Sequence, residues 1–307
     1  MTVFSLSDSY VYCQQLAKQT AGNFYYSFLG LRREQFLAMC VLYAYMRTVD
    51  DLGDHPQRLP AERAESLIRW RVELQQVLNN NQVLAEQSYD PCFPALLDII
   101  QRYQIPQSYF FEVIAGVESD LHPVAFQTFD ELADYCYRVA GVVGLCCIHI
   151  WGFHDERAFD AGIECGLAFQ MTNILRDLSE DVEMGRVYLP QDDLDRFSYL
   201  RPDIQDQIYD DRFRSLMQFQ VQRTRGFYQN SERLFDYISP AGQGILRAMY
   251  RIYGGILNEI ERMDYDVYSS RAGLPRWRKL LIAGEAIVSS RWFSSRSVKK
   301  RKPPIIG

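Results

Sequence analysis

Apolar residues recur every three or four positions through most of this chain, the period of an α-helix with one buried face. Stretches that alternate apolar and polar residues are few, and no strand–helix–strand rhythm is evident. Glycine and proline, as at Gly30, in the loop 53–60 and at Gly152, divide the pattern into about ten helical segments. We therefore predict an all-α fold, with one helical domain over residues 1–290 and a basic tail at 291–307.

The composition is that of a folded protein that needs no disulfides. Apolar residues make up 48% of the 307 positions and charged residues 23%, which argues against disorder. The seven cysteines are odd in number and lack paired C-x-x-C spacing, as expected for reduced thiols in a cytosol. The net charge of −6 argues against nucleic acid as a partner.

Nothing in the chain requires a membrane-spanning segment. The first residues lack the basic and apolar regions of a secretory signal. The longest nearly apolar run, 139–151, is shorter than the about 20 residues that a spanning helix needs. We expect a cytoplasmic protein, and the basic run 299–302 suggests peripheral contact with an anionic membrane surface as a hypothesis. A tail that is merely solvated is the alternative.

The first acidic cluster follows a strongly apolar helical stretch, in the segment 43–54. Asp50 and Asp54 are four positions apart, on the same helical stripe as Tyr43 and Arg47. Two carboxylates at this spacing repel each other by a few tenths of a kcal/mol on an exposed helix, so a bound cation would explain the pairing. A polar helix end that runs into the loop at His55 is the alternative interpretation.

The second cluster repeats this geometry more than a hundred residues later, where Asn173, Asp177 and Asp181 stand four positions apart in turn. All three side chains offer oxygen, and Mg²⁺ is usually held by one or two carboxylates together with substrate phosphates. A solvated face would carry basic partners four positions away, which this stripe lacks, and we expect Arg176 to point away from it. Two such stripes favour a metal site.

Arginines accompany both clusters. Arg47 lies on the first stripe, and Arg186 lies in the turn 185–190 that closes the second. Because a guanidinium donates two parallel hydrogen bonds to phosphate oxygens, both are candidates for binding phosphate. Two acidic stripes facing each other across a helical bundle would hold Mg²⁺, or Mn²⁺ as an alternative ion, able to grip a diphosphate leaving group.

Four segments together resemble the squalene/phytoene synthase family: 23–28, 43–54, 135–144 with the sequence YCYRVAGVVG, and 170–190. The resemblance implies a single-domain isoprenoid-synthase helical bundle with a central cavity between two aspartate-rich motifs. It implies that Asp50 and Asp54 form the first motif and Asp177 and Asp181 the second. With Asn173, these residues would hold magnesium ions that bridge prenyl diphosphate substrates.

The resemblance also assigns roles around the diphosphates and the reacting carbons. These are carried by Tyr43, Arg47, Tyr137, Gln170, Arg186 and Tyr188. Tyr135 is close to Tyr137 in the sequence and is the alternative to it. In the implied reaction one diphosphate leaves, and the double bond of the second prenyl group attacks the resulting cation to give a cyclopropyl diphosphate. Released pyrophosphate or a tyrosine then takes the proton.

Several products remain open within this family. The segment 23–28 looks most like bacterial presqualene diphosphate synthases, which join two farnesyl diphosphates, and this is the first hypothesis. Phytoene synthase, acting on two geranylgeranyl diphosphates, is the second. Squalene synthase is the third, although no G-x-G-x-x-G motif supports binding of NADPH. A non-catalytic helical scaffold and a terpene cyclase acting on one substrate are the alternatives from other classes.

Overall fold

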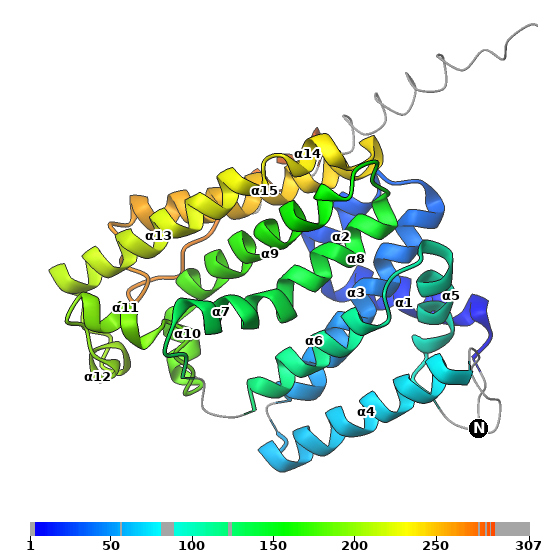
Figure 1. Cartoon of the computed structure of the whole chain (residues 1–307), viewed down its shortest axis with the longest axis horizontal. Coiled ribbons are helices and arrows are strands. Elements are labelled where there is room, and N and C mark those ends of the chain that lie inside the picture. Colours follow the sequence, from blue (N-terminus) through cyan, green and yellow to red (C-terminus); the bar gives the residue numbers. More distant parts are fainter. Residues whose placement is uncertain are drawn as a thin grey trace, which may run out of the picture.

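The computed structural model describes residues 4–55, 57–80, 89–121, 125–275, 277–279, 281–282 and 284–285, with the backbone alone at residues 23, 24 and 26 (Figure 1). Over these ranges the chain forms fifteen α-helices and one π-helical segment. They are α1 Leu6–Thr20, α2 Asn23–Phe28, α3 Arg33–Gly53, α4 Pro60–Asn80, α5 Phe93–Tyr103, α6 Ser108–Ser119, α7 Phe129–Cys136, η1 Tyr137–Gly141, α8 Val142–Trp151, α9 Arg157–Arg176, α10 Leu178–Glu183, α11 Gln191–Arg196, α12 Arg201–Gln205, α13 Asp211–Ser231, α14 Leu234–Tyr237 and α15 Pro240–Arg262.

The all-α prediction is confirmed, and the described ranges contain two isolated β-bridges in place of any sheet. The helices outnumber the about ten segments expected from glycine and proline breaks. The additional ones are short, such as α10 and α11 with 6 residues each and α14 with 4. Helices this short lie below the length at which an apolar period can be recognised in a sequence. The predicted basic tail at 291–307 lies outside the described residues.

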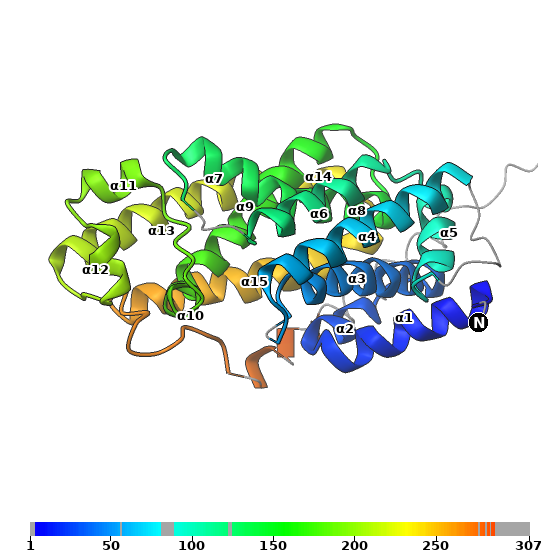
Figure 2. The same cartoon turned by 90° about the horizontal axis from the view of Figure 1, so that it is seen from below.

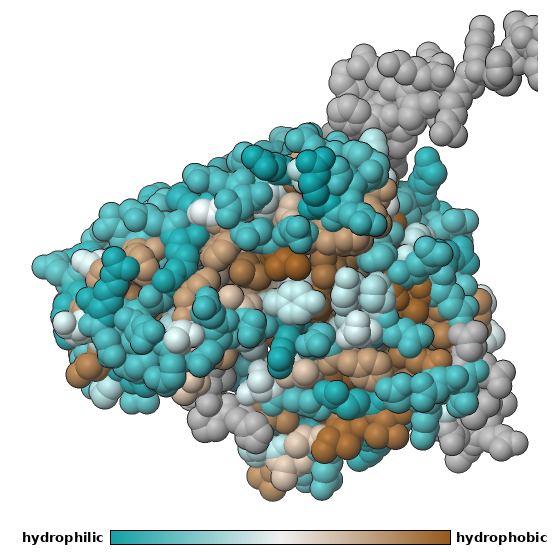
Figure 3. Space-filling view, in the orientation of Figure 1, coloured by the Kyte–Doolittle hydropathy of each residue, from teal (hydrophilic) through white to brown (hydrophobic). Residues whose placement is uncertain are grey.

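Helix α9 forms the centre of the bundle. It packs against α13, η1, α8 and α15, while α3 forms a second centre with α1, α4, α5 and α6. Figures 1 and 2 show the long helices running side by side along the length of the molecule, with α9 between α13 and the α7–α8 stretch. Figure 3 shows a mostly polar outer face with apolar surface in its middle, over α9. The functional residues are therefore carried by packed, interior helices.

Glycines allow α9 to touch its neighbour through the backbone. A Cβ atom at Gly166 would lie 2.6 Å from the Cα and 2.7 Å from the nitrogen of Gly141. One turn earlier, a Cβ at Gly162 would lie 2.4 Å from Ile148. Gly141 ends the π-helical segment η1, and such segments are often found at functional sites. The side chains on either side of this contact are held in a fixed register.

The helical stretch Phe129–Trp151, made of α7, η1 and α8, is long and apolar enough to cross a membrane by length and composition. From the sequence, the apolar run 139–151 was judged too short to span a membrane. The helical stretch is longer than this run because it begins ten residues earlier, where the Thr128 side chain accepts a hydrogen bond from the Glu131 N–H. Half of its apolar window is buried inside the protein, and η1 and α8 both pack on α9. A core helix of a bundle has these properties.

We predict that Gly166→Ala destabilises the protein by about 1–3 kcal/mol, since the added methyl meets backbone atoms that cannot rotate away. Gly226→Ala in α13 is the matched control. Nothing lies within 4 Å of the Cβ position there, so this change stabilises the helix by about 0.5–1 kcal/mol. Urea unfolding followed by circular dichroism measures both. Equal effects of the two substitutions would contradict the packing described for Gly166.

Candidate functional site

The four predicted aspartates lie at the ends of helices, spaced as expected. Asp50 is on the last turn of α3, and the N–H of Asp54 donates to the Asp50 carbonyl at 2.8 Å. Asp177 ends α9 and precedes α10, and its N–H donates to the Asn173 carbonyl at 2.8 Å. The Asp181 N–H donates in turn to the Asp177 carbonyl at 2.9 Å. Each motif is therefore a stripe on one helical face, and the second stripe continues across a break between helices.

An arginine joins the two stripes. Arg186 follows Gly185, whose φ of 76° lets the chain reverse, and its N–H donates to the Asp181 carbonyl at 2.8 Å. Its guanidinium extends to the first stripe, where Nη2 donates to Asp54 Oδ1 at 2.6 Å. The Arg186 side chain is largely buried, whereas the Asp54 carboxylate is about half exposed, and because both groups are charged the hydrogen bond is stronger than one between neutral groups. Stripes that are more than a hundred residues apart in the chain thus face one site.

A third carboxylate lies between the stripes, and the sequence analysis missed it. Asp120 ends α6, and the hydroxyls of Tyr135 and Tyr188 donate to its Oδ2 and Oδ1 at 2.9 and 3.0 Å. Both tyrosines are buried, and their rings stack with centroids 5.2 Å apart. Tyr188 is positioned by the β-bridge between Val187 and Ala125. Asp120, like Asp54, is an acidic residue at the end of an apolar helix, and this sequence pattern could have identified Asp120 as a candidate.

Three carboxylates of the site, those of Asp50, Asp120 and Asp181, hold their protons more tightly than carboxylates in water do. Loss of hydration, followed by repulsion from Asp54, raises the pKa of Asp50 to about 7, although the residue as a whole is solvent-exposed. Loss of hydration, followed by repulsion from Asp177, raises the pKa of Asp181 to about 7. Loss of hydration raises the pKa of Asp120 to about 6, against the opposing effect of Arg186. The site has an excess of negative charge that a cation would relieve.

Two tyrosines near the site differ in what they contact. Tyr135, in α7, reaches Asp120 as described above, whereas the expected residue Tyr137 begins η1 and is only partly buried. Loss of hydration, followed by the nearby charge of Glu112, raises the pKa of Tyr137. Its ring packs on the backbone of Gly141. Of the two, Tyr135 is the tyrosine whose hydroxyl reaches the acidic site.

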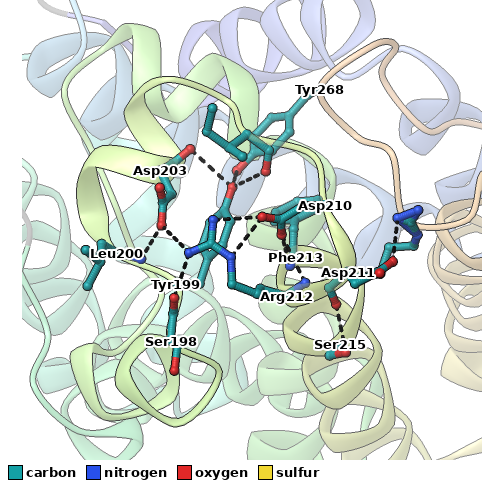
Figure 4. A network of polar contacts seen from close by, with 12 residues as sticks. Ser198, Tyr199, Leu200, Asp203, Asp210, Asp211, Arg212, Phe213, Ser215 and Tyr268 are labelled. Carbon is teal, nitrogen blue, oxygen red and sulfur yellow. Dashed lines mark hydrogen bonds and ion pairs between the residues drawn. The ribbon is translucent and has the colours of Figure 1, made fainter.

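The segment that follows α15 is fixed to α13 by a polar network (Figure 4). Tyr199 is fully buried, and its hydroxyl lies 2.5 Å from the Ile208 carbonyl and 3.3 Å from the hydroxyl of Tyr268. The ring of Tyr268 stacks on Phe213 with centroids 4.5 Å apart. Arg212 forms ion pairs with Asp203 and Asp210. The network places the residues just after Tyr268 beside the second stripe.

Asp177 has two arginine partners. Arg176 donates from Nε to Asp177 Oδ1 at 2.6 Å, so the expectation that Arg176 points away from the stripe was wrong. At the end of α9 the backbone leaves the helical conformation, which turns neighbouring side chains toward each other. Arg271 donates from Nη2 to Asp177 Oδ1 at 2.6 Å and from Nε to Glu180 at 3.0 Å. Arg271, distant in sequence, could not have been assigned from local spacing.

The remaining candidates line the approach to the site. Arg47 pairs with Asp51 at 2.6 Å and is partly exposed, and Tyr43 is half-buried one turn before it. The Asn173 amide donates to Gln170 Oε1 at 3.3 Å. Gln170 and Asn173 also line an apolar cavity of about 210 Å³ between η1, α8, α9 and α15. A polar site rich in charge therefore opens onto an apolar pocket.

The donor set fits Mg²⁺ shared with a substrate. Within the described ranges, no three Asp, Glu, His or Cys side chains converge closely enough to hold an ion by themselves. Mg²⁺ usually keeps water and binds one or two carboxylates together with substrate phosphates. The oxygens of Asp50 and Asp54 on one side, and of Asn173, Asp177 and Asp181 on the other, provide such partial sites. Diphosphate oxygens and water would supply the other ligands.

Comparisons with known proteins point to one family. The model of the squalene/phytoene synthase family matches residues 17–278. Phytoene synthase of Arthrospira platensis is 35% identical over 288 residues, which cover 90% of this chain and 91% of the relative. The 15-cis-phytoene synthase of Synechocystis sp. is 35% identical over 289 residues, which cover 90% and 84%.

Solved structures give the same fold. A dehydrosqualene synthase in complex with a ligand matches with a TM-score of 0.80 and 24% identity, covering 94% of this chain and 98% of that one. The squalene synthase HpnC from Alicyclobacillus acidocaldarius matches with a TM-score of 0.77 and 26% identity, covering 85% and 95%. The chain therefore belongs to the squalene/phytoene synthase family. It is a prenyltransferase, from the family that condenses prenyl diphosphates head to head.

We predict that Asp50→Asn raises the Tm of the metal-free protein by a few degrees at pH 8 and that the gain fades toward pH 5. The pKa of Asp50 is about 7 in the folded protein and ordinary, near 3.8, in the unfolded chain. The native state therefore binds the extra proton between these values, so wild-type stability falls as the pH rises through this window and stays low above it. Asparagine carries no charge at any of these pH values, so the variant does not lose stability in this way.

Scanning calorimetry with EDTA between pH 5 and pH 8 measures this difference. Asp51→Asn is the matched control, because Asp51 is exposed and already paired with Arg47, so no gain at pH 8 is expected from it. A Tm gain for Asp50→Asn that is the same at both pH values would contradict the account.

Proposed function

We propose that this protein is a phytoene synthase, which joins two geranylgeranyl diphosphates head to head with Mg²⁺. The observation that carries the proposal is the pair of aspartate stripes joined by Arg186 at the opening of an apolar cavity. Both substrates of such a reaction have a charged diphosphate head and an apolar tail, and the site offers surfaces for both. Relatives that are named phytoene synthase support the choice of product, at 35% identity over 90% of the chain.

The metal ligands in this proposal are Asp50 and Asp54 on α3 and Asn173, Asp177 and Asp181 on α9 and α10. Bound Mg²⁺ supplies Lewis acidity that neutralises the charge developing on the departing diphosphate. The raised pKa values of Asp50 and Asp181 favour this role, because carboxylates that repel each other bind a cation with a gain in energy.

Arginines and neighbouring polar groups hold the diphosphates in this proposal. Arg186 and Arg47 come from opposite sides of the site, and each can donate two hydrogen bonds to phosphate oxygens. Arg271 is a further diphosphate ligand, because a cation bound to Asp177 would free the Nη2 group of Arg271 while Glu180 keeps hold of its Nε. The polar groups that complete this surface are Tyr43, Gln170 and Tyr188.

Tyr135 is the tyrosine that we assign to the reacting carbons, in place of Tyr137. Its hydroxyl is buried, donates to Asp120 and lies beside the hydroxyl of Tyr188 at 3.4 Å. Loss of hydration and the charge of Asp120 raise its pKa well above the ordinary value, so it stays protonated and can orient or stabilise charge without ionising. Asp120 acts through the two tyrosines as a positioning residue.

Joining two farnesyl diphosphates to presqualene diphosphate is the second candidate. It was the first hypothesis from the sequence, and the structural likeness to squalene synthase HpnC, at 26% identity, favours it. The same aspartates and arginines would serve it, because the two reactions share their first step. They differ in the length of the tail and in whether the cyclopropyl diphosphate is the product or goes on to lose its second diphosphate. A continuation to squalene would additionally need NADPH.

The test is product analysis by mass spectrometry after the pure protein and Mg²⁺ are incubated with geranylgeranyl or farnesyl diphosphate, with and without NADPH. Forty-carbon phytoene from geranylgeranyl diphosphate without NADPH would support the proposal. A thirty-carbon diphosphate made from farnesyl diphosphate in preference would move the assignment to presqualene diphosphate synthase. A product with the carbon count of one substrate, or none from either, would refute head-to-head condensation.

We predict that Tyr135→Phe lowers kcat by roughly 10²-fold or more, the scale of losing a donor aimed at developing charge. Tyr137→Phe is the matched control two positions away, and it should stay within a few-fold of wild type, since its hydroxyl does not contact the acids described. Steady-state kinetics with circular dichroism as the folding check measures both. A larger loss of kcat in Tyr137→Phe would restore the assignment made from resemblance.

A further inference from the structure

The apolar cavity extends along α9 away from the acidic site, and the helix register shows which lining residues lie farthest from that site. Helices α8 and α9 are antiparallel, with Gly141 against Gly166 and Gly144 against Gly162. Asn173 lies at the acidic site, so Gly162, which also lines the cavity, lies toward the opposite end. At 1.5 Å per residue of helix, these two positions are about 16 Å apart along α9. A chain bound with its head at Asn173 would extend toward Gly162.

Trp151, the last residue of α8, lies at the end of the cavity away from Asn173. It lines the cavity, and only 4% of its surface is exposed. Gly242 on α15 packs flat against it, since a Cβ there would be 2.7 Å from Trp151 Cβ and 2.8 Å from its ring. The indole Nε1 is buried without a hydrogen-bond partner among the described atoms. The ring is therefore held by packing and shape.

The backbone that carries Trp151 is fixed from two further directions. The Gln35 side chain, on α3, donates to the carbonyls of Ile150 and Trp151 at 3.0 and 3.2 Å. Gly152 ends α8 with a φ of 85°, and its carbonyl accepts from the Ser239 N–H at 2.8 Å. The adjacent residue forms an antiparallel bridge to the segment before α15. Contacts from α3 and from the start of α15 thus hold the end of α8, and Trp151 with it, in a fixed position.

We propose that Trp151 is the floor of the prenyl pocket and sets the longest tail that the enzyme accepts. This inference rests on the proposed function, in that the cavity holds the tail of a prenyl diphosphate. Affinity for apolar surface alone discriminates weakly, by about 10–200-fold per methylene, and it always favours the longer tail. A rigid wall rejects an additional isoprene unit by overlap, because packed interiors do not yield to it.

The test compares selectivity among farnesyl, geranylgeranyl and geranylfarnesyl diphosphate as ratios of kcat/KM. Trp151→Phe and Trp151→Leu remove increasing volume from the floor, and the first is mild enough to preserve folding. We expect both to shift the ratio toward the next longer substrate relative to wild type, by about tenfold or more for Trp151→Leu. The order should be wild type, Trp151→Phe, Trp151→Leu.

Trp70→Leu is the matched control. Trp70 is also buried, at 5% exposure, but it packs on Phe93 and does not line this cavity. It should lower Tm and leave the selectivity ratio unchanged. Unchanged ratios in both Trp151 variants, or an equal shift in Trp70→Leu, would overturn the inference. Wild-type protein that turns over none of the three substrates would instead overturn the proposed function.

Discussion

The ion pair between Arg186 and Asp54 is the contact on which the site depends, because it joins the ends of two helices that carry the acidic stripes. Without a positive charge between them, the carboxylates of Asp50, Asp120 and Asp181 would repel one another with no cation to offset the repulsion. Even with Arg186, loss of hydration and mutual repulsion keep the pKa values of these groups raised. The site is thus costly to the metal-free fold and suited to a cation and a diphosphate.

The packing of α9 against η1 and α8 connects this charged site to the apolar pocket. Gly166 touches the backbone of Gly141, and this contact sets the register of the two helices. On one side of it, Tyr135 reaches Asp120 between the stripes. On the other, the cavity continues toward Trp151. One helix pair therefore orients both the groups that bind the head of a substrate and the walls that would surround its tail.

Local patterns in the sequence predicted the helices and the two aspartate stripes, because helical spacing alone decides that Asp50 and Asp54 share a face. What the spacing could not predict was contact between distant segments. Asp120 and Arg271 join the site through the packing of α6 and of the segment after α15. Arg176 turns toward Asp177 because α9 ends between them. The apolar period of the sequence did not reveal this helix end. The difference between Tyr135 and Tyr137 likewise depends on a distant contact, because the Tyr135 hydroxyl reaches Asp120 at the end of α6.

The central claim is that the two stripes together bind metal ions and a diphosphate. A crystal structure with Mn²⁺ and an unreactive thiodiphosphate analogue of geranylgeranyl diphosphate, with anomalous scattering used to locate the metal, tests it most directly. The account predicts metal peaks beside Asp50 and Asp54 and beside Asn173, Asp177 and Asp181, with the diphosphate between them. An analogue bound elsewhere, or bound between the stripes with no metal at either, would contradict it.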